Sequence, residues 1–277
     1  MDTFKILAPA LFGLAVLLIA FAVYVVLCAT GRTPEVAGMD RRKFGDGFGP
    51  YLTRYMYWVV GPIERALLAN NISPNAITAL SLVACMGAGI AIALGHLAAM
   101  TWLYALAGTL DLIDGRLARA TGRSSPAGAL FDSVADRWGE LFVLSGCVWY
   151  LRETNWLIAP LVAIAGSLMV SYTRARGEGL GIALDGGAMQ RAERIVLTSL
   201  GALIAAMLAV SPSTAEYAVV AVGASLLLVG VASSGTALGR WLAGYRMLLA
   251  KEAGKAARPA PAPEPAANMR ITGEHTA

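Results

Sequence analysis

Cysteine, histidine and charge are all scarce in this 277-residue chain. The three cysteines lie in apolar runs and form no Cys-x2-Cys pair, which argues against a disulfide framework or a zinc site. The two histidines, His96 in a short connector and His275 near the C-terminus, are poorly placed for a histidine-based catalytic triad. Only 14% of the residues are charged, whereas 57% are hydrophobic and the mean hydropathy is +0.62. This composition indicates a polytopic membrane protein.

The first 71 residues do not resemble the rest of the chain. Residues 1–30 predict an extra N-terminal transmembrane helix, since the apolar run 5–28 is too long for a signal peptide and no clear cleavage site follows it. Residues 31–71 predict a basic linker followed by an interfacial amphipathic helix, in which aromatic residues alternate with charged ones.

The remaining apolar runs predict an all-α bundle of six helices over residues 72–250. The expected spans are 72–94, 99 into the acidic stretch described below, 126–150, 156–172, 195–210, and 215–231 with a polar extension to 249. Residues 251–277 are rich in alanine and proline and have no apolar period, so we expect a disordered tail.

Lysine and arginine are concentrated in alternate connectors. Segments 32–65, 116–123, 174–194 and 240–270 hold 6, 3, 4 and 6 of them, whereas connectors 95–100, 150–155 and 211–214 hold only Arg152. By the positive-inside rule, the first set faces the cytoplasm. This predicts seven spans in the cell (inner) membrane, with the acidic stretch on the cytoplasmic side. Topology and anionic lipids explain the net charge of +4 better than nucleic acid does.

One acidic stretch, residues 111–136, interrupts the apolar runs with the pattern D-x2-D-G-x2-A-R-x8-G-x3-D-x3-D. Four bare carboxylates in membrane helices would cost on the order of 10 kcal/mol, so a cation must offset them. On helices, Asp111 and Asp114 share one stripe, and Asp132 and Asp136 share an i, i+4 row. Such hard oxygen ligands suit Mg²⁺ or Mn²⁺, and two ions could hold a pyrophosphate.

The small residues of this stretch, Gly115, Ala118 and Gly128, would let a nucleotide's sugar and phosphates approach the helix backbones. The alternative interpretation is that they only allow close helix packing.

With Arg119 included, the acidic stretch resembles the signature of the CDP-alcohol phosphotransferase (CDP-alcohol phosphatidyltransferase) family without a gap or a substitution. The resemblance covers about residues 70–250. It implies that a phosphatidyl group moves from CDP-diacylglycerol to an alcohol and that CMP is released. It also implies a residue set, as follows: Asp111, Asp114, Asp132 and Asp136 bind two Mg²⁺ or Mn²⁺ ions, Asp136 also takes the proton from the acceptor hydroxyl, and Gly115, Ala118, Arg119 and Gly128 contact the CDP-lipid.

The segment 72–78, ISPNAIT, looks like the start of the family's first core helix. The resemblance implies that Pro74, Asn75 and Thr78 line the cytidine pocket. Ser73 and Pro74 are equally an ordinary helix start, with an N-cap serine and a proline in the first turn.

The acceptor pocket is predicted from residues outside the acidic stretch. Ser171, Arg174, Arg194 and Arg240 resemble a phosphate-binding set in the family members that make phosphatidylinositol phosphate from inositol phosphate. Arg174 departs from the lysine expected there, which keeps the charge but changes its geometry. Arginines in such segments also serve membrane topology, and we interpret Arg191 as a loop residue of that kind.

Other functions remain open at this point. Glycerol 3-phosphate is the competing acceptor, an ion-coupled secondary transporter is the alternative of another class, and a catalytically silent scaffold is a third. The clustering of the four aspartates disfavours a transport relay, and the presence of all four disfavours a scaffold. We further expect a homodimer in the lipid bilayer and no nucleic-acid partner.

Overall fold

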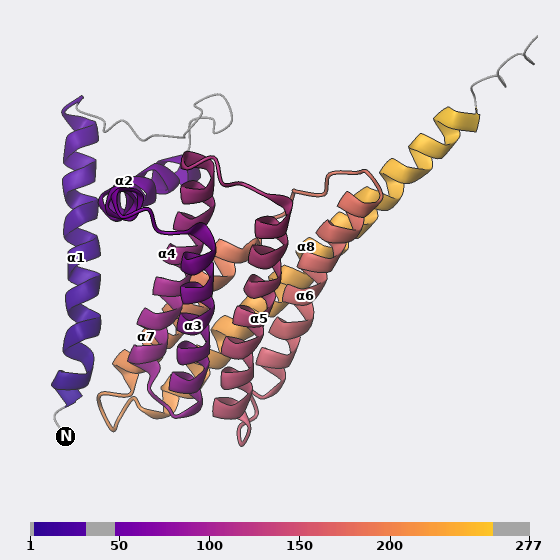
Figure 1. The fold of residues 1–277 in the computed structure, drawn as a ribbon. Coiled ribbons are helices and arrows are strands. Elements are labelled where there is room, and N and C mark those ends of the chain that lie inside the picture. The colour runs from indigo at the N-terminus through magenta and orange to yellow at the C-terminus, as the bar shows by residue number, and fades with distance from the viewer. Residues whose placement is uncertain (1–2, 32–47, 257–277) are drawn as a thin grey trace, which may run out of the picture.

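The structure is a computed structural model that describes residues 3–31 and 48–256, and every regular element in these ranges is a helix (Figure 1). The elements are α1 (Thr3–Ala29), α2 (Phe48–Ala69), α3 (Pro74–Ala93), α4 (Leu97–Ala120), α5 (Pro126–Leu151), α6 (Ile158–Gly179), α7 (Arg191–Leu208) and α8 (Glu216–Ala256). The prediction of an all-α membrane bundle is confirmed. The linker residues 32–47 and tail residues 257–277 lie outside the described part.

Two of the helices that build the site start in the same way. Ser73 caps α3 by accepting a hydrogen bond from the Ala76 amide at 3.2 Å, and Ser125 caps α5 by accepting one from the Gly128 amide at 3.1 Å. Each serine is followed by a proline in the first helical turn, where a missing amide proton costs nothing. The sequence therefore sets where both helices begin, and both begin at the same end of the bundle.

The core helices cross closely where they carry glycine. α3 meets α5 at Gly89 and Gly146, and α6 meets α8 at Gly166 and Gly230. A Cβ atom added at Gly230 would lie 2.6 Å from the backbone nitrogen of Ala163, so only glycine fits there. Close backbone approach at small residues is the usual way in which membrane helices pack.

α2 lies across one end of the bundle (Figure 1), and its position at the membrane interface remains a prediction. It docks on α4 through Glu64, whose Oε2 atom pairs with Arg116 Nη2 at 2.7 Å. The Arg116 guanidinium also lies 4.1 Å from the centre of the Tyr57 ring, a cation-π contact. Arg116 lies inside the acidic stretch, so this contact ties α2 to the helix that carries Asp111 and Asp114.

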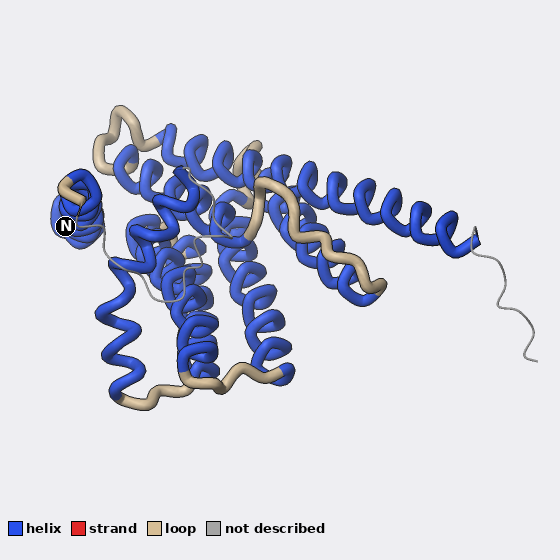
Figure 2. Tube along the Cα trace, turned by 90° about the horizontal axis from the view of Figure 1, so that it is seen from above, coloured by secondary structure: helices blue, strands red, loops and turns tan. Residues whose placement is uncertain are grey.

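α1 stands at the edge of the bundle, where it is seen end-on from above (Figure 2). It contacts α2 through an aromatic cluster in which Tyr24 packs against Tyr55 and Trp58, with ring centres 5.5 and 5.6 Å apart. Tyr24 is fully buried. α1 is thus a packed part of the fold.

Four helices in the described part are long and apolar enough to span a membrane, namely α3, α4, α6 and α8. The count of seven spans remains a prediction. α5 and α7 are not among the four: α5 carries several charged residues, including Asp132, Asp136 and Glu140, and α7 has 18 residues that begin with the charged sequence RAER. Exposed leucines, valines and isoleucines cover the outer faces, for example Val83, as a lipid-facing surface would require.

Two helices are longer than expected. α6 continues two turns past Tyr172 to Gly179, and α8 runs unbroken to Ala256, into the segment predicted to be a tail. Arginine, alanine, lysine and glutamate in these extensions are strong helix formers, which polarity alone does not reveal. As a result, Arg174 lies on a helix and not in a loop.

Candidate active site

Three of the four predicted metal ligands converge between α4 and α5. Asp111, Asp114 and Asp132 each offer a carboxylate oxygen, and these three oxygens lie within 4.8 Å of one another. The Thr78 hydroxyl of α3 donates a 2.6 Å hydrogen bond to Asp114 Oδ2, and both side chains are buried. Such a bond orients the carboxylate and leaves its other oxygen for a ligand.

The chemistry of this acidic cluster fits a divalent cation. The Oδ1 atom of Asp132 is buried and makes no hydrogen bond, although an unpaired buried carboxylate oxygen is costly. Three hard oxygen donors within 4.8 Å of one another are a suitable partial coordination set for Mg²⁺ or Mn²⁺. A bound ion would satisfy the unpaired oxygen and offset the repulsion between the carboxylates.

Asp136 lies one helical turn after Asp132 on α5, but it is held by an arginine. Arg191 Nη1 lies 2.7 Å from Asp136 Oδ1, and Arg191 Nε lies 3.5 Å from Asp111 Oδ2. Arg191 is the first residue of α7. It supplies a cation that bare carboxylates in a membrane helix need.

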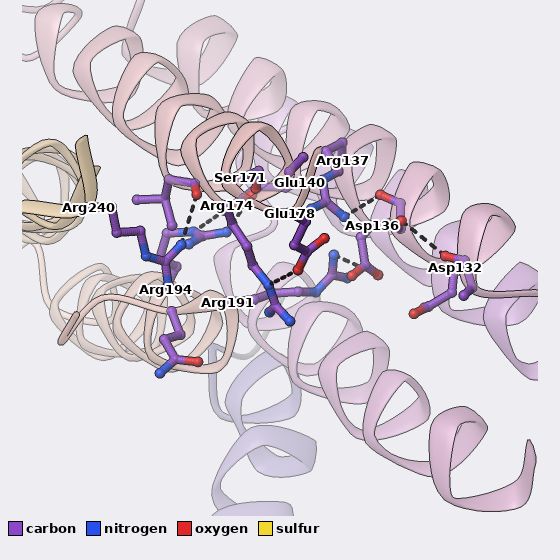
Figure 3. Close-up of a pocket in the computed structure, with 15 residues that line it drawn as sticks. Asp132, Asp136, Arg137, Glu140, Ser171, Arg174, Glu178, Arg191, Arg194 and Arg240 are labelled. Atoms are coloured by element: carbon purple, nitrogen blue, oxygen red, sulfur yellow. Dashed lines mark hydrogen bonds and ion pairs between the residues drawn. The ribbon is translucent and has the colours of Figure 1, made fainter. Parts of the chain in front are cut away.

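A cavity of about 360 Å³ opens beside Asp132 and Asp136 (Figure 3). The four residues predicted to bind the acceptor phosphate all line this cavity, together with Arg191, as follows: Ser171 and Arg174 from α6, Arg191 and Arg194 from α7, and Arg240 from α8. The structure therefore brings the predicted acceptor residues to the same space as the predicted base.

The three arginines predicted to bind the acceptor phosphate differ in their burial and in their partners. Arg194 is buried and makes a bidentate ion pair with Glu140 of α5, at 2.6 and 3.0 Å. Arg240 donates to the backbone carbonyls of Gly186 and Val170, at 2.8 and 2.9 Å. Arg174 is half-exposed and pairs with Glu178 at 3.0 Å on the helix surface. Arg194 and Arg240 are therefore held by partly or fully buried hydrogen bonds, whereas Arg174 makes only exposed ion pairs, with Glu178 and with Asp185.

The residues predicted to contact the CDP-lipid lie near the start of α3 and α5 and along α4. A Cβ atom added at Gly128 would lie 3.6 Å from the Asn75 side-chain oxygen, which places the starts of α3 and α5 side by side. Gly115 and Ala118 are partly exposed on α4, and Arg119 is exposed. Around Gly115, an added Cβ atom would meet only the flexible Arg119 side chain. This face of α4 is open beside Asp114.

Two residues of this site were not singled out from the sequence. The interpretation of Arg191 as a loop residue is wrong, since it begins α7 and contacts two of the acidic-stretch carboxylates. Glu140 was not considered, although it extends the i, i+4 row of Asp132 and Asp136 on α5. The sequence carries only part of this signal, namely the continued row on α5 and two arginines three residues apart, and the packing of the helices is needed to bring them together.

Carboxylates that suit divalent ions and arginines that suit phosphate meet at one cavity of a helical membrane bundle. This is the arrangement of a membrane phosphotransferase. Sequence comparison agrees, because residues 71–233 match the CDP-alcohol phosphatidyltransferase family over more than half of the chain, and the chain belongs to this family. Enzymes of the family use divalent metals such as Mg²⁺ or Mn²⁺.

Two relatives with named activities align with more than half of this chain. The phosphatidylinositol phosphate synthase of Mycobacterium marinum is 32% identical over 162 residues, which are 55% of this chain and 68% of the relative. A bifunctional IPC transferase and DIPP synthase of Rubrobacter xylanophilus is 36% identical over 182 residues, which are 64% of this chain but only 38% of the relative.

Solved structures show the same fold. Mycobacterium tuberculosis phosphatidylinositol phosphate synthase with CDP-DAG bound has a TM-score of 0.57 and 29% identity, with coverage of 66% of this chain and 92% of that one. The same enzyme in complex with manganese and citrate has a TM-score of 0.58 and 28% identity, with coverage of 66% and 88%. The protein is thus an enzyme of phospholipid synthesis.

Proposed function

We propose that this enzyme transfers the phosphatidyl group of CDP-diacylglycerol to inositol phosphate, releasing CMP and forming phosphatidylinositol phosphate. The observation that carries the proposal is the single cavity shared by Asp136, the predicted base, and Ser171, Arg174, Arg194 and Arg240. An acceptor whose phosphate is held by these arginines would present its hydroxyl group to Asp136. The names of the relatives support the same acceptor.

In this proposal Asp111, Asp114, Asp132 and Asp136 would hold two divalent ions, which supply charge neutralisation of the diphosphate and of the departing phosphate. Asp136 takes the proton from the acceptor hydroxyl. The acceptor oxygen then forms a bond to the lipid-side phosphorus, the bond from that phosphorus to the bridging oxygen breaks, and CMP leaves with the electron pair. The chain's own part is mainly positioning and proton transfer.

The CDP-lipid would lie on the opposite side of the carboxylates from the acceptor. Gly115, Ala118 and Gly128 leave room for the nucleotide, and Arg119 would contact its phosphates. Pro74, Asn75 and Thr78 would line the cytidine pocket; for Thr78 this comes in addition to its hydrogen bond to Asp114.

The orientation and assembly are also part of the proposal. The basic ends of α4, α6 and α8 and the start of α7 lie at the site's end of the bundle, which supports a cytoplasm-facing active site by the positive-inside rule. We propose that the enzyme acts in the lipid bilayer as a homodimer, on the strength of the family resemblance.

The test is CMP release by the purified protein from CDP-diacylglycerol and Mg²⁺ with a panel of acceptors. We expect inositol phosphate to be used best, with free inositol and serine poor substrates. A preference for glycerol 3-phosphate would preserve the phosphate pocket and change only the product. A preference for free inositol or serine would remove the phosphate pocket from the proposal.

A further inference from the structure

We propose that Arg191 is an exchangeable counter-charge: it pairs with Asp136 when no divalent ion is bound there, leaves Asp136 when divalent ions bind, and then binds the acceptor phosphate. This inference rests on the proposed function for the nature of the acceptor. The rest of the inference depends on the contacts that Arg191 makes with Asp136 and Asp111. Arg191 would thereby couple metal loading to acceptor binding.

Asp136 stands apart from the other three carboxylates of the acidic stretch. Asp111, Asp114 and Asp132 place their oxygens within 4.8 Å of one another, but Asp136 is not part of this group. Its Oδ1 atom instead lies 2.7 Å from Arg191 Nη1. The guanidinium occupies one of the two Asp136 oxygens, so a metal ion that used this oxygen would have to displace Arg191.

The two arginines in the first turn of α7 differ in how they are paired. Arg194 is held by two short hydrogen bonds to Glu140, and its side chain is only 4% exposed. Arg191 has one close contact to Asp136, a longer one of 3.5 Å to Asp111, and a side chain that is 19% exposed. Its Nε atom is buried without a hydrogen bond. Arg194 is thus a fixed arginine, and Arg191 is one whose pairing is incomplete and open to exchange.

The charge of the site with two divalent ions bound also favours release of Arg191. Four carboxylates carry −4, which two divalent ions balance at +4, so before the CDP-lipid binds Arg191 would add an uncompensated positive charge beside them. Arg191 lines the same cavity as Ser171, Arg174, Arg194 and Arg240. An acceptor phosphate bound in that cavity would lie within reach of Arg191, and arginine binds phosphate with two parallel hydrogen bonds.

The test measures Mn²⁺ binding to the purified protein without any acceptor, from the electron paramagnetic resonance signal of free Mn²⁺. If Arg191 holds Asp136 about nine-tenths of the time, Arg191→Gln should lower the apparent dissociation constant for Mn²⁺ about tenfold. Arg191→Lys keeps the competing charge, so its Mn²⁺ affinity should stay within about threefold of wild type. Arg152→Gln is the matched control, because Arg152 is exposed at the other end of the bundle and pairs with Glu153.

The second arm measures the KM for inositol phosphate at saturating Mn²⁺. Arg191→Gln should raise it at least tenfold while the KM for CDP-diacylglycerol stays unchanged, so the same change tightens metal binding and weakens acceptor binding. A purely structural ion pair would not move the two in opposite directions. Thermal melting in detergent checks that each variant is folded.

Unchanged or weaker Mn²⁺ binding by folded Arg191→Gln would overturn the inference. If Arg191→Gln does not fold, Arg191→Lys decides: retained Mn²⁺ affinity with a raised inositol phosphate KM supports the inference, and an unchanged KM overturns it. The metal arm contains no acceptor. A wild-type preference for free inositol would therefore refute the proposed function without affecting that arm.

Discussion

The buried pair of Arg194 and Glu140 makes the sharpest test of the acceptor pocket, because the proposed function gives Arg194 a role in substrate binding in addition to its role in stability. Both oxygens of Glu140 accept hydrogen bonds from Arg194, at 2.6 and 3.0 Å, and the two side chains are 10% and 4% exposed. Arg194→Ala would leave Glu140 as an unpaired buried charge. Breaking a buried pair in this way costs about 3–5 kcal/mol of stability.

The same substitution would also remove one of the proposed ligands of the acceptor phosphate. A charge-assisted hydrogen bond to the acceptor contributes about 2–3 kcal/mol, so its loss should raise the KM for inositol phosphate roughly 30- to 150-fold. The double variant Arg194→Met with Glu140→Met separates the two effects. Because a buried ion pair can be replaced by apolar residues of similar size at little cost, the double variant should regain most of the lost stability.

The assay pairs thermal melting in detergent with initial rates at varied inositol phosphate and varied CDP-diacylglycerol. We expect Arg194→Ala to lower the melting temperature and to raise the acceptor KM. The double variant should melt close to wild type, keep the raised acceptor KM, and have an unchanged KM for CDP-diacylglycerol. If the double variant regains the wild-type acceptor KM, Arg194 acts only through stability and does not bind the acceptor.

Three further predictions concern the acidic cluster. Chelation with EDTA should abolish turnover and Mg²⁺ or Mn²⁺ should restore it, whereas full activity in EDTA would exclude a metal mechanism. Asp136→Asn cannot take a proton and should lose at least about 100-fold in kcat. Mn²⁺ titration of this variant distinguishes loss of the base from loss of metal binding. A near-normal kcat would show that Asp136 takes no part in the chemistry. Thr78→Val deletes the hydroxyl group that orients Asp114 and should weaken Mn²⁺ binding about 10- to 100-fold, measured by the same titration; unchanged binding would show that the hydrogen bond has no orienting role.

Helix starts were readable from the sequence where local chemistry decides them. Ser73 with Pro74 predicted the start of α3, and the Ser-Ser-Pro segment before Ala127 predicted that of α5, because capping is a matter of neighbouring residues. Helix ends were less predictable. The polar ends of α6 and α8 continue as helix because their residues favour it, and hydropathy does not register this preference.

The acidic cluster was predictable because its ligands lie close together in the sequence with a helical period. Its counter-charges were not, since Arg191 is 55 residues away from Asp136 and resembles any arginine of a cytoplasmic connector. Only the packing of α7 beside α4 identifies Arg191 as part of the site. The role of Glu140 is not predictable from the sequence for a related reason, because it depends on Arg194, which lies on another helix.

The pairing of α5 with α7 also bears on how the protein is made. Glu140 precedes Arg194 by 54 residues, so at a synthesis rate of about 5–20 residues per second the carboxylate emerges roughly 3 to 10 s before its arginine. During that interval α5 carries Asp136 and Glu140 without the cations that hold them in the finished bundle. Nascent α5 must therefore stay in a polar setting, such as the membrane surface or the translocon, until α7 arrives. Membrane insertion of α5 and formation of its ion pairs with α7 are then one event.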